Sequence, residues 1–229
     1  MRALVFDFDG LILDTETPEF TVWTETFHSY GVEMPPDYWT DVIGRGAEQE
    51  IERPPQLLFR LTGAEEVLTP TFYEELRVRI RAAIELEQVR PGVERLLWEA
   101  KEAGMGLGVA SSSKHIWVDK YLKKLGLFER FDHVVCADDV HRAKPFPDLY
   151  LQCCSQLGVS SDAAVALEDS PNGLAAAKAA GLFAVVVPNS VTARLDLSAA
   201  DLRVDSLETT GLEGLLFSTK TRRAQSFTQ

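Results

Sequence analysis

Short apolar runs alternate along the chain with segments long enough to form helices, and this alternation restricts the fold more than any other feature. The runs lie at residues 3–6, 106–110, 133–136, 164–167 and 183–187, with a weaker one at 202–204. The central runs show no clean polar alternation, which is typical of strands covered on both faces in a parallel sheet. Strands separated by helical segments predict a doubly wound α/β sheet.

The interval between the first two runs breaks this alternation, because it carries helical patterns only. Apolar residues recur three or four positions apart from Phe20 to Tyr30, and a longer charged helix is predicted over 69–86. A third segment, 49–61, contains Pro54-Pro55, which predict a break or kink. We therefore expect a core of residues 1–15 and 89–217, an inserted helical domain at 16–88 and a flexible tail at 218–229.

Composition limits the classes of partner. The chain has 229 residues, 45% of them hydrophobic, and its net charge of −12 argues against nucleic acids or anionic membranes, which need a basic face. No apolar stretch approaches the roughly 20 residues that span a bilayer, and the N-terminus shows no signal-peptide pattern. Three cysteines, two of them adjacent, do not suggest a disulfide framework. We expect a cytoplasmic protein and, by default, a monomer.

Unusual polar residues follow four of the predicted strands, at the edge where ligands bind in open α/β sheets. They are Asp7 and Asp9 after the first run, Ser111 to Lys114 after the second, Asp138, Asp139 and Lys144 after the third, and Glu168 to Ser170 after the fourth. Each of them alone has an ordinary structural explanation, such as a helix cap or a surface charge. Their agreement on one edge of the sheet predicts a functional site.

The charges of this set favour a cation and a phosphate ester. Asp7, Asp9 and Asp169 bring three negative charges and Lys144 brings one positive charge. Mg²⁺ would balance them, since it favours a few carboxylates with waters and a substrate oxygen. Histidine and cysteine ligands are not required, so zinc is disfavoured. Ser111 and the backbone amides after Asp7 would supply further donors to a phosphate.

A mechanism follows from these residue types. Asp7, held by the metal and by Lys144, attacks phosphorus and forms an aspartyl-phosphate. Asp9 gives a proton to the departing oxygen and then takes one from the attacking water. Lys144, Ser111 and Mg²⁺ stabilise the charge on the transferring phosphoryl group.

Four sequence motifs resemble those of the haloacid-dehalogenase-like hydrolases. They are Asp7-Phe8-Asp9-Gly10, Ser111, Lys144 and Glu168-Asp169, and their order and spacing are similar to the branch of β-phosphoglucomutase and phosphoglycolate-phosphatase-like enzymes. The resemblance implies a Rossmann-like core with a helical cap. It also implies Asp7 as nucleophile, Asp9 as acid and base, and Mg²⁺ held by the Asp7 side chain, the Asp9 backbone carbonyl and Asp169, with Glu168 acting through water.

The predicted site therefore has three overlapping groups. The catalytic residues are Asp7, Asp9, Ser111 and Lys144; the substrate-binding residues are Gly10, Ser111, Ser112, Lys144 and Arg45; the metal-binding residues are Asp7, Asp9, Asp169 and, through water, Glu168.

The cap segment departs from the mutase pattern. A histidine follows the second motif aspartate by ten positions in the mutases, whereas this chain has Glu19 there, preceded by Pro18. The Lys-Gly-x-Ser-Arg loop of the mutase cap is replaced by residues 42–47, where Arg45 could reach a substrate anion or lie on the surface. Both departures weaken a mutase interpretation.

Several functions stay open at this point. We expect a Mg²⁺-dependent phosphatase for a small phosphorylated metabolite, because a cap that closes over the site suits small substrates better than phosphoproteins. A sugar-phosphate mutase is the main alternative. A dehalogenase needs no metal, so Asp9 and Glu168-Asp169 disfavour it. A phospho-accepting signalling receiver stores the acyl phosphate, whereas the cap and Asp9 favour turnover. An α/β domain without activity explains the motifs least.

Overall fold

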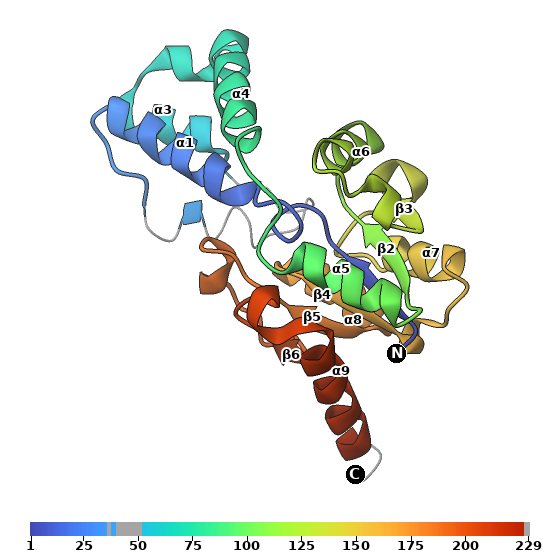
Figure 1. Ribbon diagram of the computed structural model, residues 1–229. Helices are drawn as coiled ribbons and strands as arrows, with labels where there is room; N and C mark the ends of the chain where they lie inside the picture. The colour runs from blue at the N-terminus through green and yellow to red at the C-terminus, as the bar shows by residue number, and fades with distance from the viewer. Residues whose placement is uncertain (36–37, 40–51, 227–229) are drawn as a thin grey trace.

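The computed structural model describes residues 1–35, 38–39 and 52–226. Its centre is a six-stranded parallel sheet in the order β3-β2-β1-β4-β5-β6, which confirms the predicted doubly wound α/β fold (Figure 1). The strands are β1 (Ala3–Phe6), β2 (Gly106–Ala110), β3 (His133–Val135), β4 (Ala164–Glu168), β5 (Phe183–Val186) and β6 (Leu202–Arg203). The first strand lies in the middle, where Ala3 pairs with Gly106 on one side and Ala164 on the other. This register brings the carboxyl ends of β1, β2 and β4 to one edge.

Helices cover both faces of the sheet, because its central strands are buried on both sides. Alternate residues of β1 enter two different clusters: Leu4 and Phe6 pack with α5 (Val93–Glu102), α6 (His115–Lys124) and α9 (Leu207–Ser226). Ala3 and Val5 pack with α7 (Asp148–Gln156) and α8 (Pro171–Ala179). Short 3₁₀ turns complete the core: η2 (Phe128–Arg130), η3 (Ala137–Asp139), η4 (Ser161–Ala163) and η5 (Thr192–Arg194).

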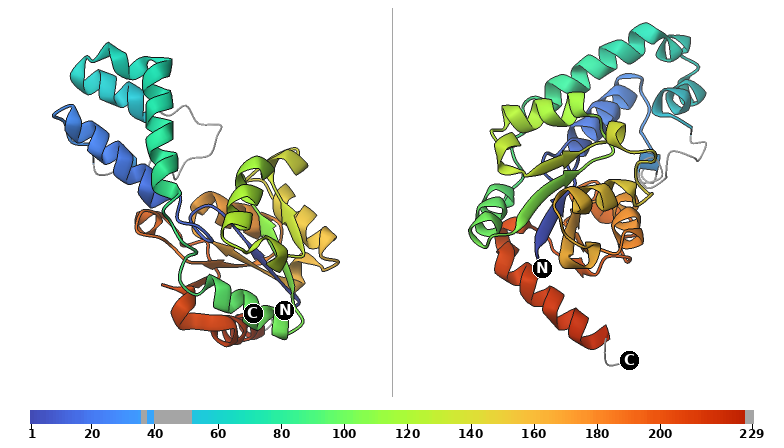
Figure 2. Two further views of the ribbon diagram at one scale, coloured as in Figure 1. Left: turned by 45° about the horizontal axis from the view of Figure 1, so that its top comes forward. Right: turned by 90° about the vertical axis from the view of Figure 1, so that its right-hand side faces the viewer.

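The segment between β1 and α5 is helical in the described residues, as predicted. It contains α1 (Glu16–Ser29), α3 (Pro54–Thr62), η1 (Glu65–Leu68) and α4 (Pro70–Ile84). These helices share a hydrophobic cluster of their own, centred on residues such as Trp23, Phe27 and Leu58. Figure 2 shows them standing together beside the strand-end edge of the sheet. We call this set, α1, α3, η1 and α4, the cap helices.

Prolines mark the beginning of α3. Pro54 and Pro55 occupy its first positions, where a missing N–H is tolerated, and Gly63 ends it with φ 73°. The break predicted at these prolines is thus a helix start, and residues 49–51 of the predicted helical segment lie outside the described residues.

The C-terminal segment of the chain is more helical than expected. α9 extends to Ser226, so much of the segment 218–229 that we expected to be a flexible tail has helical backbone. The helix is interrupted at Gly211, whose φ of 58° and ψ of 178° are not helical.

Among the residues that the structure describes, no helix has the length and apolar character needed to cross a bilayer. Cys136, Cys153 and Cys154 are buried and form no disulfide.

Candidate active site

The carboxyl ends of β1, β2 and β4 converge on a cavity of about 230 Å³ at the foot of the cap helices. Its lining consists of Asp7, Asp9, Glu16, Ser112, Lys144, Asp169, Ser170 and Asn172. Asp7 directly follows β1, and its N–H donates to the carbonyl of Leu167, so the sheet ladder itself fixes the position of this residue. A larger hollow of about 670 Å³ between α5 and α9 contains none of the predicted site residues.

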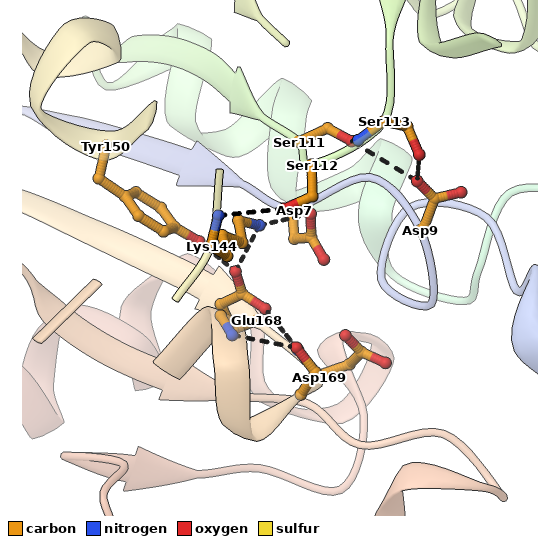
Figure 3. Close-up of polar contacts among 11 residues, drawn as sticks. Asp7, Asp9, Ser111, Ser112, Ser113, Lys144, Tyr150, Glu168 and Asp169 are labelled. Carbon is orange, nitrogen blue, oxygen red and sulfur yellow. Dashed lines mark hydrogen bonds and ion pairs between the residues drawn. The ribbon is translucent and has the colours of Figure 1, made fainter. Parts of the chain in front are cut away.

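Lys144 joins two acidic residues from different strands (Figure 3). Its Nζ lies 2.6 Å from Oδ1 of Asp7 and 2.6 Å from Oε1 of Glu168. Burial of the ammonium would lower its pKa, but these two carboxylates outweigh burial and hold the pKa of Lys144 above its usual value. The lysine is therefore a permanent positive charge at the base of the cavity.

Glu168 is fully buried, and its environment differs from that of an ordinary surface carboxylate. Burial and the charge of Asp7 raise its pKa to about 7, against the opposing effects of Lys144 and of the hydroxyl donated by Tyr150. Gly173 lies so close that a Cβ atom there would fall within 2.1 Å of the carboxylate oxygens. The side chain of Glu168 is thus enclosed, and it contacts the cavity residue Lys144.

Asp9 faces away from this cluster and is held by residues at the start of α6. Its Oδ2 accepts a hydrogen bond of 2.6 Å from the Ser113 hydroxyl, and its Oδ1 accepts one of 2.9 Å from Nε1 of Trp117. Burial raises the pKa of Asp9 and the charge of Asp7 adds to this, although the two hydrogen bonds oppose them. The carboxyl group is oriented by both of its oxygens.

Ser111 lies deeper than a simple phosphate-binding role suggests. Its hydroxyl is buried, accepts a hydrogen bond of 3.0 Å from the N–H of Ser113 and donates weakly to Asp9 over 3.5 Å. The neighbouring Ser112 lines the cavity, and its hydroxyl accepts from the N–H of Lys144 over 3.3 Å. Ser111 therefore lies on the Asp9 side of the site and Ser112 on the Lys144 side.

The two carboxylate oxygens of Asp169 differ in their hydrogen bonding. Its Oδ2 accepts a hydrogen bond of 2.9 Å from Nδ2 of Asn189. Its Oδ1 is buried and has no hydrogen-bond partner among the described residues. Burial raises the pKa of Asp169 well above its usual value, and the charges of Glu16 and Asp7 add to this effect. A buried carboxylate oxygen without a partner is costly unless a cation or a proton is bound.

The donor set fits Mg²⁺. Oxygens of Asp7, Glu168 and Asp169 lie within 4.8 Å of one another, and all three are hard carboxylate ligands. Gly10 lies directly against Asp169, where a side chain would not fit: a Cβ atom at Gly10 would lie 2.2 Å from Oδ2 of Asp169. The φ of Gly10 is 79°, a left-handed conformation that favours glycine. The backbone carbonyl of Gly10 accepts from the guanidinium of Arg90, which also donates to the carbonyls of Val187 and Pro188.

A second group of metal-type ligands, His115, Cys136 and Asp138, is already engaged. The two ring nitrogens of His115 contact Asp119 at 3.0 Å and Asp139 at 2.7 Å. Burial raises the pKa of the Cys136 thiol to about 12, so a thiolate is disfavoured. We assign no metal to this group.

The structure thus brings together Asp7, Asp9, Gly10, Ser111, Ser112, Lys144, Glu168 and Asp169 from the predicted set. Arg45 lies outside the described residues. Sequence reasoning assigned no role to Glu16, Ser113, Trp117, Tyr150 or Asn189. Ser113 lies within the serine run that follows the second predicted strand, and Glu16 and Tyr150 lie shortly after the first aspartate motif and after Lys144. No pattern in the sequence marked Trp117 or Asn189.

A buried lysine and clustered carboxylates at the strand ends of a parallel α/β sheet are typical of a Rossmann-like enzyme. The family model for haloacid dehalogenase-like hydrolases matches residues 4–187, and the chain belongs to this family. YhcW of Bacillus subtilis (strain 168), which is named as a phosphatase, is 44% identical to this chain over 211 residues. The match covers 90% of this chain and 92% of YhcW.

Two further relatives bear on the chemistry. β-Phosphoglucomutase of Bacillus subtilis (strain 168) is 30% identical over 194 residues, which are 82% of this chain and 83% of the mutase. The crystal structure of a CbbY mutant from Rhodobacter sphaeroides in complex with xylulose-(1,5)bisphosphate is 30% identical, with a TM-score of 0.69, and the match covers 94% of this chain and 99% of CbbY.

Proposed function

We propose that this protein is a Mg²⁺-dependent phosphatase that hydrolyses a small phosphorylated metabolite through an aspartyl-phosphate on Asp7. The observation that carries this proposal is the cavity in which Asp7 stands between a buried ammonium, 2.6 Å away on Lys144, and the unpartnered Oδ1 of Asp169. Family membership and the phosphatase name of YhcW support the hydrolase chemistry.

Mg²⁺ would be held by the carboxylates of Asp7 and Asp169 and the backbone carbonyl of Asp9, with Glu168 acting through water. When bound, the cation would neutralise negative charge on the phosphoryl oxygens and so favour attack by an anionic nucleophile. Lys144 contributes a second, permanent positive charge, and Ser112 adds a hydroxyl group that lines the cavity on the β2 side. We also propose the predicted phosphate contact for Ser111, whose hydroxyl lies buried beside Ser113 and Asp9. The backbone at Gly10 borders the same pocket.

Asp7 is the proposed nucleophile. Lys144 occupies its Oδ1, so Oδ2 is the oxygen placed to attack phosphorus. The new Oδ2–P bond forms as the ester P–O bond breaks, and the leaving oxygen takes a proton from Asp9. A water molecule then gives its proton to Asp9 and attacks phosphorus, which breaks the Oδ2–P bond, releases inorganic phosphate and restores Asp7.

Asp9 suits both proton transfers. Its raised pKa, caused mainly by burial, favours a protonated acid at the start of the cycle. Ser113 and Trp117 fix the direction of its carboxyl group, which is needed for a proton to reach the leaving oxygen at hydrogen-bond distance.

The cap helices would restrict the substrate to small molecules. We propose that residues 16–88 form a cap domain on a core of residues 1–15 and 89–217, and that its closure excludes bulk water. Arg45 is proposed to contact a substrate anion from the cap. We also propose a cytoplasmic, monomeric enzyme; buried cysteines without a disulfide are compatible with a reducing compartment.

A sugar-phosphate mutase is the alternative, since β-phosphoglucomutase is among the relatives. A panel of sugar phosphates and organic-acid phosphates, assayed with Mg²⁺ for both inorganic phosphate and phosphorylated products, separates the two. Phosphate release that stops on chelation supports the phosphatase. Conversion of a hexose 1-phosphate to the 6-phosphate without phosphate release would overturn it in favour of the mutase.

A further inference from the structure

The side-chain amide of Asn189 lies where the core meets the cap helices. Asn189 follows β5 and is 6% exposed. Its Nδ2 donates to Oδ2 of Asp169 and to Oε2 of Glu16, each over 2.9 Å. Its Oδ1 accepts from the N–H groups of Val191 and Thr192, also over 2.9 Å each. Because two carboxylate acceptors lie at Nδ2 and two backbone N–H donors lie at Oδ1, only one orientation of the amide satisfies all four contacts.

This orientation decides which oxygen of Asp169 remains available. The hydrogen bond from Asn189 occupies Oδ2, so the buried Oδ1 is the oxygen left for a cation. Without the amide, the Asp169 carboxylate could turn and present either oxygen. Asn189 therefore acts on the proposed Mg²⁺ site without lining the cavity.

The same short segment also holds the start of α1. Glu16 is the first residue of that helix and contacts Asn189. The hydroxyls of Thr17 and Ser190 lie 2.9 Å apart, and Val191 packs against the hydrophobic cluster of the cap helices. Residues 189–191 thus contact the first cap helix on one side and a proposed metal ligand on the other.

We propose that Asn189 and Glu16 are positioning residues of the cation site, and that through them Mg²⁺ binding is coupled to the seating of α1 on the core. This inference rests on the proposed Mg²⁺ site. The amide of Asn189 joins the carboxyl group of Asp169 to that of Glu16, the first residue of α1, so a cation held by Asp169 would also attract the start of this helix. By thermodynamic linkage, a residue that strengthens the seating of α1 when Mg²⁺ is bound also strengthens Mg²⁺ binding.

The test is calorimetric titration of the full-length protein with Mg²⁺ alone, without any substrate. We expect Asn189→Ala to weaken Mg²⁺ binding by about 10- to 100-fold, the usual range for partners that orient a metal ligand. Glu16→Gln, which keeps the shape and removes the charge, should weaken it by about fivefold or more. Thr21→Ala is the matched control: it removes an exposed hydroxyl of α1 that donates within the helix to the carbonyl of Thr17, and it should leave the affinity within about twofold.

Hydrogen exchange tests the coupling itself. Mg²⁺ should slow exchange of the amides in the first turns of α1 in the wild type and in Thr21→Ala, and should do so much less in Asn189→Ala and Glu16→Gln. Circular dichroism shows whether each variant folds; if Asn189→Ala does not, Glu16→Gln carries the test.

Each result has a defined meaning. Wild-type affinity in both Asn189→Ala and Glu16→Gln overturns the inference, and so does equal weakening by Thr21→Ala. Weakening by Asn189→Ala alone, with unchanged protection of α1, overturns the coupling to the cap. If the wild type itself does not bind Mg²⁺, the cofactor of the proposed function fails and this inference fails with it.

Discussion

Nζ of Lys144 lies 2.6 Å from Oδ1 of Asp7, although 137 positions separate the two residues in the chain. Both side chains are almost completely buried, so the ammonium compensates negative charge that water cannot reach.

Lys144→Met is expected to destabilise the protein by about 3–5 kcal/mol, because it leaves buried carboxylates without a counter-charge. Lys178→Met is the matched control, since Lys178 forms a 2.6 Å pair with Asp201 while 40% of its side chain stays exposed; this change should cost about 1 kcal/mol or less. Urea denaturation of both variants measures the difference. Equal free energies of unfolding would contradict the importance of burial.

Asp7→Asn should reduce phosphate release by about 10⁴-fold or more, because an amide oxygen is a poor nucleophile and no other carboxylate occupies its position. The near-identical shape should preserve the fold, which circular dichroism checks. Turnover near the wild-type level would remove Asp7 as the nucleophile.

Trp117→Phe should lower kcat by about 10- to 100-fold while KM changes little, since the lost hydrogen bond to Asp9 orients the acid rather than the substrate. The control is Trp98→Phe on α5, where the indole is 59% exposed. A change confined to KM in Trp117→Phe would speak against this orienting role.

Gly10→Ala should abolish turnover, because the added Cβ would lie 2.2 Å from Oδ2 of Asp169. Gly63→Ala separates this collision from backbone strain: its φ of 73° is similar, and nothing lies within 4 Å of the added atom. Both variants should lose about 1–2 kcal/mol of stability from the left-handed conformation, and only Gly10→Ala should lose activity. Parallel activity losses would refute the collision argument.

Glu85, at the end of α4, predicts a pH dependence of stability. Hydrogen bonds from Lys120 and Lys124 lower its pKa to about 2, despite the opposing effect of burial. The pKa of Glu85 is thus lower in the folded than in the unfolded chain. Ionised Glu85 therefore stabilises the fold fully at a pH above the unfolded-state pKa, and this stabilisation is lost as the pH falls through about 4 toward 2. The carboxylate is 37% exposed, so the contribution should stay near or below 1 kcal/mol.

Glu85→Gln should therefore be less stable than the wild type at pH 7, with a difference that shrinks as the pH is lowered. Denaturant titrations at several pH values measure this trend. A difference that grows on acidification would reverse the assigned sign.

The parallel sheet and the carboxylates at its strand ends could be predicted from sequence because both depend on local patterns. Apolar runs define β1, β2 and β4, and a residue that directly follows such a run must lie at the edge of the sheet. Asp7, Ser111 and Asp169 are therefore placed by chain position alone.

Contacts made across the fold could not be predicted in this way. Trp117 reaches Asp9 because α6 packs beside β1, and Asn189 reaches Glu16 only because the cap helix begins there. Among three consecutive serines, the turn after β2 decides that Ser113, not Ser111, makes the short bond to Asp9. Such choices depend on side-chain packing, which one sequence does not display.

The most direct test of the central claim is covalent trapping on Asp7. Full-length Asp9→Asn protein is mixed with Mg²⁺ and acetyl phosphate that carries a radioactive phosphorus label, and the reaction is then quenched with acid. The acetate leaving group of this reagent needs no protonation. We predict labelled protein whose label maps to Asp7 and disappears in the Asp7→Asn, Asp9→Asn double variant. Phosphate release by the wild type without any labelled protein, or a label that survives in the double variant, would contradict the aspartyl-phosphate mechanism.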